Sequence, residues 1–128
     1  MNNTKFRDDL ISVIIPAKNE GAGLSQIIPR LRQVCPHAEI IVVNDGSSDN
    51  TKDACRAHDV RVVTHPYSMG NGAAIKSGAR SATGDILVFM DADGQHNPDD
   101  IPRLISKYNE GYDMVVGARH SSSQASLG

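Results

Sequence analysis

Two carboxylates directly follow an apolar run in the second half of the chain. Residues 86–90 are continuously apolar, and Asp91 and Asp93 come next with Ala92 between them. Because side chains alternate along an extended backbone, the two carboxylates point the same way. Converging carboxylates repel each other unless a cation lies between them. Their oxygens suit Mg²⁺ or Mn²⁺, which would leave the remaining coordination positions to water and phosphate oxygens.

Two further candidate contacts follow this pair of carboxylates. Gln95 would add a neutral carbonyl ligand, and His96 stands next to it in the sequence. The alternative for Asp91 and Asp93 is a turn that caps a helix, because Asp before Gly is common in loops. We favour the metal site because the pair ends an apolar strand, where open α/β sheets bind their ligands.

A third carboxylate, Asp45, ends another apolar run, which begins at Glu39. Its place at the end of a strand would let it accept hydrogen bonds from a base or a ribose. The alternative is an Asx turn at Asp45 with a helix N-cap supplied by Ser48 or Asp49. Both can hold together, since one of the two later residues can cap the helix while Asp45 faces a ligand.

Four cations are candidate partners for a phosphate: Lys18, Lys76, Arg80 and Arg119. Most lysines and arginines belong to solvated faces of a protein. Arg119 differs, because it follows the short strand predicted at residues 114–116 and would lie at the same edge of the sheet as the carboxylates. We therefore single out Arg119 for a phosphate contact.

Other familiar arrangements are missing or incomplete. Residues 70–74 resemble a dinucleotide glycine loop, but Ile75 stands where the third glycine belongs and the segment does not follow the first strand. We interpret it as a tight turn into a helix. The roles of His65 and His120 are undecidable from sequence, and no Ser-His-Asp or Cys-His arrangement can be inferred.

Five short β-branched runs alternate with four helical patterns along the chain. Several of the runs are apolar throughout, which is typical of strands that are covered on both faces, as in parallel sheets. Right-handed crossovers then give an α/β fold with a mostly parallel, twisted sheet and helices on both faces. In such sheets the carboxyl ends of the strands meet at one edge, and polar segments follow all five strands here. The predicted strands are residues 11–15, 39–43, 60–64, 85–90 and 114–116.

The four predicted helices differ in how clearly they are marked. In the first, Pro29 predicts either a kinked helix or one that begins near Ser25. The third is rich in small residues, which would let it approach the sheet closely. The predicted bounds are a second helix that starts within residues 47–49 and ends before Val60, a third from Asn71 or Gly72 to Ala82, and a fourth from Asn97 to Gly111.

Length and composition are those of one soluble domain. The chain has 128 residues, of which 39% are hydrophobic and 22% charged, values that are usual for globular proteins. We expect a single domain over residues 1–128, with its core at about 11–119 and a tail at 120–128. The net charge of −2 argues against a nucleic-acid partner, which would require a basic surplus.

The sequence predicts a cytoplasmic protein. No apolar run approaches the roughly 20 residues of a membrane span, and the first ten residues carry no apolar signal-peptide core. Cys35 and Cys55 have no metal-binding spacing and fit a reducing compartment better than a disulfide scaffold. A receiver-like signalling domain is disfavoured, because it would need an acidic cluster where Pro16, Ala17 and Lys18 stand.

Three motifs together resemble the family 2 glycosyltransferases. They are VIIPAKNE at residues 13–20, IVVNDGSSDNT at 41–51 and GDILVFMDADGQ at 84–95. The continuation QHNP at residues 95–98 is most similar to the branch that makes dolichyl- and polyprenyl-phosphate sugars. The resemblance covers about residues 11–119, and the motifs stand in the family's order and spacing.

The resemblance implies a nucleotide-sugar-binding fold of the glycosyltransferase A type and a metal-dependent, inverting hexosyltransferase. The donor would be a UDP- or GDP-sugar and the acceptor a polyprenyl or dolichyl phosphate. The enzyme would act on the cytoplasmic side, with the inner membrane face as a site of peripheral association. By the family pattern, the nucleotide-binding residues are Pro16, Ala17, Glu20, Asp45 and Asp91.

The same pattern implies the metal ligands and the catalytic residues. Asp91, Asp93 and Gln95 would hold Mg²⁺ or Mn²⁺ on the diphosphate, and Asp93 and Arg119 would be catalytic, with Arg119 on a phosphate of donor or acceptor. Family catalytic domains are longer than 128 residues, so we expect the acceptor half to be missing and the chain to self-associate as a homo-oligomer. The alternative function is a catalytically inactive module that binds nucleotide sugars.

Overall fold

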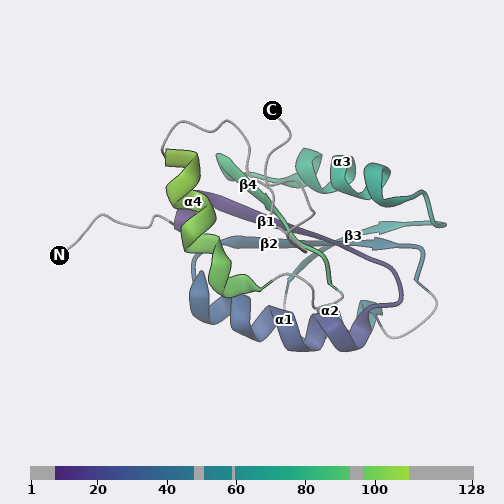
Figure 1. The fold of residues 1–128 in the computed structure, drawn as a ribbon. Helices are drawn as coiled ribbons and strands as arrows, with labels where there is room; N and C mark the ends of the chain where they lie inside the picture. The colour runs from purple at the N-terminus through teal and green to yellow at the C-terminus, as the bar shows by residue number, and fades with distance from the viewer. Residues whose placement is uncertain (1–7, 48–50, 59, 93–96, 110–128) are drawn as a thin grey trace, which may run out of the picture.

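The protein is described from a computed structural model, which covers residues 8–47, 51–58, 60–92 and 97–109. Its centre is a four-stranded, fully parallel sheet in the order β3-β2-β1-β4 (Figure 1). The strands are β1 (Ile11–Ala17), β2 (Glu39–Asp45), β3 (Arg61–His65) and β4 (Ile86–Phe89). The predicted parallel α/β sheet is confirmed; the predicted strand at residues 114–116 lies outside the described residues.

Helices cover both faces of the sheet, as predicted. In Figure 1, α3 lies on one face and α1 and α2 lie on the other. Ile101 and Ile105 of α4 pack into the same core as α1 and α2. A 3₁₀ turn at Pro98–Asp100 leads into α4, and another at Asp8–Leu10 precedes β1. Among the helices of the described residues, none combines the length and the apolar character needed to cross a membrane. The helices are α1 (Gly21–Val34), α2 (Thr51–Ala57), α3 (Asn71–Ser81) and α4 (Ile101–Asn109).

The two faces of the sheet have separate cores, which explains the continuous apolar runs. On β1, Val13 and Ile15 pack into the core under α1, α2 and α4, whereas Ile14 packs into the core under α3. All three side chains are fully buried. A strand covered on both faces needs apolar residues at every position, so alternation disappears.

Several boundaries differ from the sequence prediction by a few residues. The first helix begins at Gly21, so the expected start near Ser25 is wrong, and Pro29 lies in its interior. Pro29 removes the helical hydrogen bond to the Ser25 carbonyl, and both residues are exposed to water.

β1 and β2 each extend two residues further than predicted, to Ala17 and Asp45, and α2 begins at Thr51 rather than within residues 47–49. β3 and β4 each differ from the prediction by one residue at both ends.

Gly78 lets α3 lie directly against the sheet. A Cβ atom at this position would collide with the Ile14 side chain and would lie 3.2 Å from Cγ2 of Val43. Ile14 is fully buried and packs in one core cluster with Ile41, Val43 and Ala74. The expected close approach of the third helix is therefore confirmed, and it depends on the absence of a side chain at this residue.

We predict that Gly78→Ala destabilises the protein by about 1–3 kcal/mol, because overpacking at Ile14 outweighs the gain in helix propensity. Gly72→Ala is the matched control on the same helix, since open space surrounds that position. It should leave stability unchanged or raise it by up to about 1 kcal/mol. Urea unfolding measures both, and a Gly78→Ala variant as stable as the wild type would show that α3 can move away from the sheet.

Glu39 ties together the amino ends of the strands. Its Oε1 accepts hydrogen bonds from the Ser12 hydroxyl (2.7 Å) and the Thr83 N–H (2.9 Å), and its Oε2 accepts one from Arg61 (2.9 Å). Ser12 in turn accepts a hydrogen bond from the Gly84 N–H at 2.9 Å. Burial by itself raises the pKa of Glu39, but the hydrogen bonds from Thr83, Ser12 and Arg61 outweigh burial and lower it.

Glu39→Gln should lower the free energy of unfolding at neutral pH by about 1.5–3 kcal/mol, the range for a lost hydrogen bond to a charged group. Because the folded-state pKa lies below the unfolded one, the stabilisation is present above the unfolded pKa and is lost as the pH falls. Thermal melting of both proteins at neutral and acidic pH should show the difference shrinking on acidification. Asp85→Asn, an exposed carboxylate in the same turn, is the control and should change little.

Candidate functional site

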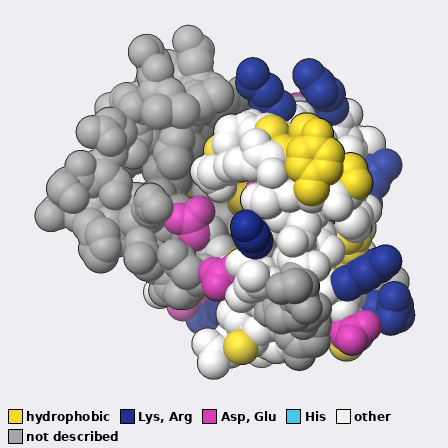
Figure 2. Space-filling model, turned by 90° about the vertical axis from the view of Figure 1, so that its right-hand side faces the viewer, with side chains coloured by type: hydrophobic (Ala, Val, Ile, Leu, Met, Phe, Trp, Pro, Cys, Tyr) yellow, Lys and Arg dark blue, Asp and Glu magenta, His cyan; other side chains and the backbone are white. Residues whose placement is uncertain are grey.

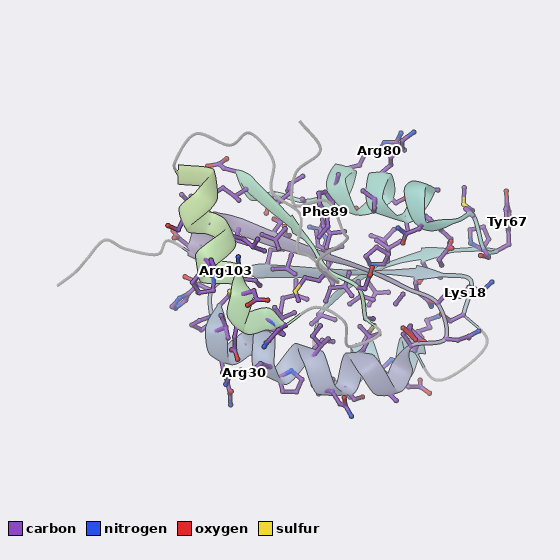
Figure 3. The ribbon with its side chains drawn as sticks, in the orientation of Figure 1. Lys18, Arg30, Tyr67, Arg80, Phe89 and Arg103 are labelled. Atoms are coloured by element: carbon purple, nitrogen blue, oxygen red, sulfur yellow. The ribbon has the colours of Figure 1, made fainter. Side chains whose placement is uncertain are left out.

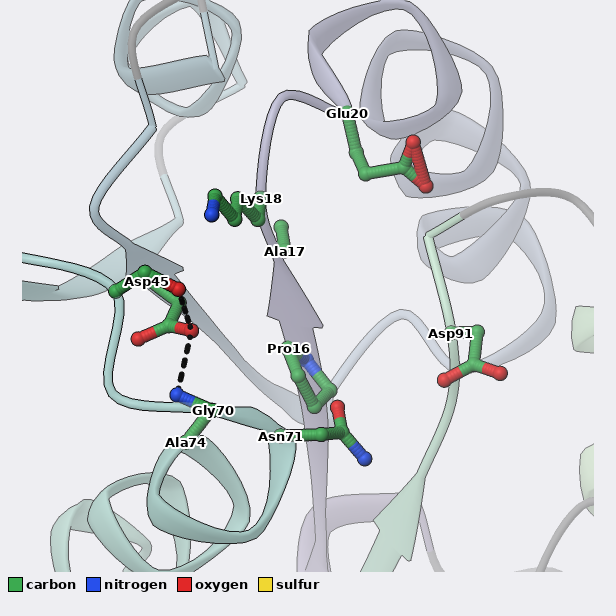
Figure 4. A pocket seen from close by; sticks show the side chains of 10 residues that line it. Pro16, Ala17, Lys18, Glu20, Asp45, Gly70, Asn71, Ala74 and Asp91 are labelled. Carbon is green, nitrogen blue, oxygen red and sulfur yellow. Dashed lines mark hydrogen bonds between the residues drawn. The ribbon is translucent and has the colours of Figure 1, made fainter.

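A cavity of about 370 Å³ opens at the carboxyl end of the sheet. It lies between the segments that follow β1, β2 and β4 and the start of α3 (Figure 4). Figure 2 looks onto this end of the molecule and shows acidic and basic side chains near one another. The lining residues are Pro16, Ala17, Lys18, Glu20, Asp45, Ser68, Gly70, Asn71, Ala74 and Asp91.

The fold brings together residues that the sequence analysis had singled out separately. They span positions 16 to 91 of the chain, and parallel pairing places the ends of their strands at one edge. Their gathering at one cavity agrees with the expected nucleoside pocket, and their contact with a nucleotide stays a prediction. The predicted nucleotide-binding residues that line the cavity are Pro16, Ala17, Glu20, Asp45 and Asp91.

Asp91 is the one predicted metal ligand that the structure describes. The N–H of Met90 donates to the Ile14 carbonyl at 3.0 Å, which continues the pairing with β1 and holds Asp91 at the end of the sheet. Its half-buried carboxylate faces the cavity (Figure 4), a position that fits an oxygen ligand for a divalent cation. Within the described residues, three or more His, Cys, Asp or Glu side chains nowhere gather as a metal site. Asp93, Gln95, His96 and Arg119 lie outside the described residues.

The segment after β1 is fixed by residues that follow β2. The Asn19 N–H donates to the Ser47 hydroxyl at 2.9 Å, and the Glu20 N–H donates to the Thr51 hydroxyl at 3.0 Å. Asn19 itself has a φ of 56°, in the left-handed region that asparagine tolerates better than most residues. This turn aims Lys18 and Glu20 at the cavity.

Of the cations proposed as phosphate partners, Lys18 is the one described residue that reaches the cavity. Lys76 and Arg80 are exposed on α3, outside the lining. Figure 3 shows Lys18 at the carboxyl end of the sheet and Arg80 on the outer side of α3. Lys18 therefore supplies positive charge to the cavity that Glu20 and Asp91 also line.

The carboxylate of Asp45 holds the segment between β3 and α3. It accepts hydrogen bonds from Nδ1 of His65 (2.8 Å), the Ser68 hydroxyl (3.2 Å), and the N–H groups of Met69 (2.8 Å) and Gly70 (3.1 Å). Burial by itself raises the pKa of Asp45, but the donors of Met69, His65, Gly70 and Ser68 outweigh burial and lower it to about 2. Asp45 is thus a buried, ionised anchor for the wall of the cavity.

The turn after β2 is closed by the neighbour of Asp45, and not by the Asx turn considered for Asp45 itself. The Oδ1 atom of Asn44 accepts a hydrogen bond from the Ser47 N–H at 3.1 Å, and the Asn44 side chain is buried. The turn after β2 is therefore closed by Asn44, while Asp45 points to the loop before α3. Gly46, with a φ of 72°, packs against that loop, since a Cβ there would lie 2.5 Å from the Ser68 nitrogen.

Sequence reasoning missed part of the lining, namely Ser68, Gly70, Asn71 and Ala74. Two signals were available: the polar segment after the third predicted strand, which we expect at the same edge of the sheet, and the glycine-rich segment at 70–74, which we interpret as a turn into a helix. That interpretation is confirmed, because α3 begins at Asn71 and Gly70 has a φ of 99°. The turn also contributes to the cavity, and the Asn71 amide extends between Pro16 and Asp91 in Figure 4.

The chain belongs to the glycosyl transferase family 2, whose family model matches residues 12–127. Its parallel sheet with flanking helices matches solved structures of glycosyltransferases of the A type. The polyprenyl-phosphate branch, in contrast, finds no counterpart among the similar structures described next.

Three similar structures are of glucosyl-3-phosphoglycerate synthase from Mycobacterium tuberculosis. The complex with Mn²⁺, UDP and glucosyl-3-phosphoglycerate has a TM-score of 0.66 and 30% identity over 77% of this chain and 39% of that chain. The complex with Mn²⁺ and UDP-glucose has a TM-score of 0.68 and 30% identity, over 79% of this chain and 39% of that chain. The UDP complex has a TM-score of 0.70 and 27% identity, over 87% of this chain and 47% of that chain. This chain therefore spans less than half of the length of each.

We predict that Asp45→Asn lowers the free energy of unfolding at pH 7 by about 2 kcal/mol, because an amide NH₂ would replace one carboxylate oxygen and would face the N–H of either Met69 or Gly70, which donate to different oxygens. The folded-state pKa of Asp45, about 2, lies below its usual 3.8. The stabilisation is thus full above about pH 4 and is lost as the pH falls toward 2. Urea unfolding between pH 3 and 7 measures the difference in unfolding free energy between Asp45→Asn and the wild type. This difference should be constant above about pH 4 and should shrink below it.

The matched control is Asp53→Asn, which changes an exposed carboxylate on α2. It should leave the free energy of unfolding within about 0.5 kcal/mol of the wild type. If the two variants behaved alike, Asp45 would not be the anchor that its hydrogen bonds indicate.

Proposed function

We propose that this chain binds a nucleotide sugar, UDP- or GDP-linked, in the cavity at the carboxyl end of the sheet, and that it is the donor-binding part of an inverting glycosyltransferase. The observation that carries the proposal is the gathering of residues from all three family motifs on one polar cavity. Solved structures of a similar protein in complex with UDP and UDP-glucose support it.

The nucleoside would occupy the side of the cavity formed by β1 and β2. Pro16 and Ala17 offer an apolar surface there, and Asp45 holds the opposite wall. Glu20 and Asn71 supply polar groups at the rim that can hydrogen-bond to a ribose or a base. The combination of a small apolar surface with a few convergent polar groups is usual for cofactor and nucleotide sites.

A divalent cation would be held by Asp91 together with Asp93, with Gln95 as a further ligand. Asp91 fits this role, because its carboxylate faces the cavity at the end of a buried strand. When bound, such a cation would neutralise the charge that grows on a departing nucleoside diphosphate. Lys18 contributes positive charge to the same cavity, and Arg119 would contact a phosphate of donor or acceptor.

The acceptor we propose is a phosphate carried by a polyprenyl or dolichyl chain, on the strength of the QHNP continuation at residues 95–98. An anionic phosphate oxygen needs no general base to attack the sugar, whereas a hydroxyl does. The similar structures carry the name of a synthase of glucosyl-3-phosphoglycerate, so 3-phosphoglycerate is the natural competing acceptor in any assay.

Titration calorimetry with UDP, GDP and UDP-glucose, with and without Mn²⁺, tests the donor and the metal together. We expect Mn²⁺-dependent binding in the wild type, abolished by Asp93→Ala and strongly weakened by Asp91→Ala. Asp53→Ala, which removes an exposed carboxylate in the first turn of α2 and outside the cavity lining, should bind like the wild type. Unchanged affinity in both carboxylate variants would overturn the metal ligands, and no nucleotide binding at all would overturn the function.

Turnover is a separate measurement with the same protein. Incubation with UDP- or GDP-glucose or -mannose and either polyprenyl phosphate or 3-phosphoglycerate should give product with the first acceptor, with inverted anomeric configuration by NMR. Product with 3-phosphoglycerate alone would overturn the lipid acceptor. Binding without turnover on either acceptor would favour the inactive nucleotide-sugar-binding module.

A further inference from the structure

A chain of hydrogen bonds runs from α3 through β3 to the end of β2. The hydroxyl of Ser77 lies 2.8 Å from Nε2 of His65, and Nδ1 of His65 lies 2.8 Å from Oδ1 of Asp45. Both His65 and Asp45 are buried, at 7% and 6% exposure. Because a carboxylate only accepts, Nδ1 carries the proton and donates to Asp45. In the neutral ring, Nε2 then accepts from the Ser77 hydroxyl.

The order Ser-His-Asp is that of a nucleophilic triad, but the placement excludes that role. Ser77 lies in the second half of α3, and its side chain is not part of the cavity lining. A substrate in the cavity would meet the start of the same helix, at Gly70, Asn71 and Ala74. The chain of hydrogen bonds therefore reaches the cavity wall at Asp45. Ser77, at its other end, has a structural role only.

The wall depends on the orientation of the Asp45 carboxylate. An ionised carboxylate has about four acceptor positions, and donors of His65, Ser68, Met69 and Gly70 occupy four. The two backbone donors, Met69 and Gly70, lie directly before α3. If the carboxylate turned, both N–H groups would lose their partner, and Gly70, which lines the cavity, would no longer be fixed.

We infer that His65 and Ser77 are positioning residues for the nucleotide-binding cavity: they hold the Asp45 carboxylate so that it fixes Met69, Gly70 and the start of α3. The ligand of the cavity, a nucleoside diphosphate, rests on the proposed function. The role of His65 in holding Asp45, Met69 and Gly70 does not depend on that function. The same contacts also imply that Asp45 shapes the cavity through the loop that it holds, because donors of the protein already fill its four acceptor positions.

The test combines a local and a functional measurement on four variants. Hydrogen exchange of the Met69 and Gly70 amides, read by NMR in the ligand-free protein, reports whether the wall is held. Calorimetry with UDP and GDP in the presence of Mn²⁺ reports whether the cavity is formed. The variants are His65→Phe, His65→Asn, Ser77→Ala and, as a control on the same helix, Ser81→Ala.

His65→Phe keeps the bulk of the ring and removes both hydrogen bonds. It should accelerate exchange at Met69 and Gly70 and weaken nucleotide binding about tenfold, as for one lost hydrogen bond to a charged group. His65→Asn, whose amide N–H can replace the Nδ1 donor, should recover part of both effects. Ser77→Ala should act in the same direction but less strongly, and Ser81→Ala should match the wild type.

Several outcomes would overturn the inference. Wild-type exchange and affinity in His65→Phe would show that the wall does not need this histidine. Equal behaviour of His65→Phe and His65→Asn, or faster exchange of core amides such as Ile14 to the same extent, would reduce His65 to a space-filling residue. If the wild type bound neither nucleotide, the proposed function would fail, while the exchange of Met69 and Gly70 would still decide whether His65 holds the wall.

Discussion

A buried, ionised Asp45 is the constraint on which the cavity depends. Removing a carboxylate from water is costly unless every acceptor position finds a donor. Here the donors come from β3 and from the loop before α3, so satisfying the charge forces these segments against the end of β2. Although burial raises the pKa of Asp45, the donors of Met69, His65, Gly70 and Ser68 lower it to about 2. The carboxylate is therefore ionised over the whole physiological range, and the arrangement is fixed there.

A second carboxylate, at the other end of the same strand, does the same for the far end of α3. Glu39 begins β2 and accepts hydrogen bonds from Thr83, just after the helix, whereas Asp45 ends β2 and accepts one from Gly70, just before it. Between them, Gly78 brings the helix into direct contact with Ile14. The helix is thus held to β2 at both ends and to β1 in the middle, which fixes where its first turn meets the cavity.

At the mouth of the cavity, the strands and the segments that follow them have different roles. Buried strands supply rigid positions, and the residues that follow them carry the polar groups, so charge can be concentrated without weakening the core. Lys18, Glu20 and Asp91 stand on three sides of a polar space that would suit a nucleoside diphosphate and a cation. The tight turn at Asn19, fixed by Ser47, keeps two of these side chains directed inward.

The sequence alone determined the parallel sheet and many of the residues that line the cavity. Apolar runs and helical spacing are local, periodic signals, and parallel pairing then brings Ala17, Asp45 and Asp91 to one edge whatever the details between them. The sequence also indicated the close approach of α3, because small residues are visible as such.

Only the tertiary structure decided what Asp45 does. Asn44 and Asp45 are adjacent polar residues, and either could close the turn after β2; the choice follows from which side chain faces the loop before α3. His65 and Ser77 stand 20 and 32 residues from Asp45 in the sequence, with no period or motif that relates them. Their contact arises because β3 pairs with β2 and α3 packs across both strands, and such pairings between distant segments leave no local trace.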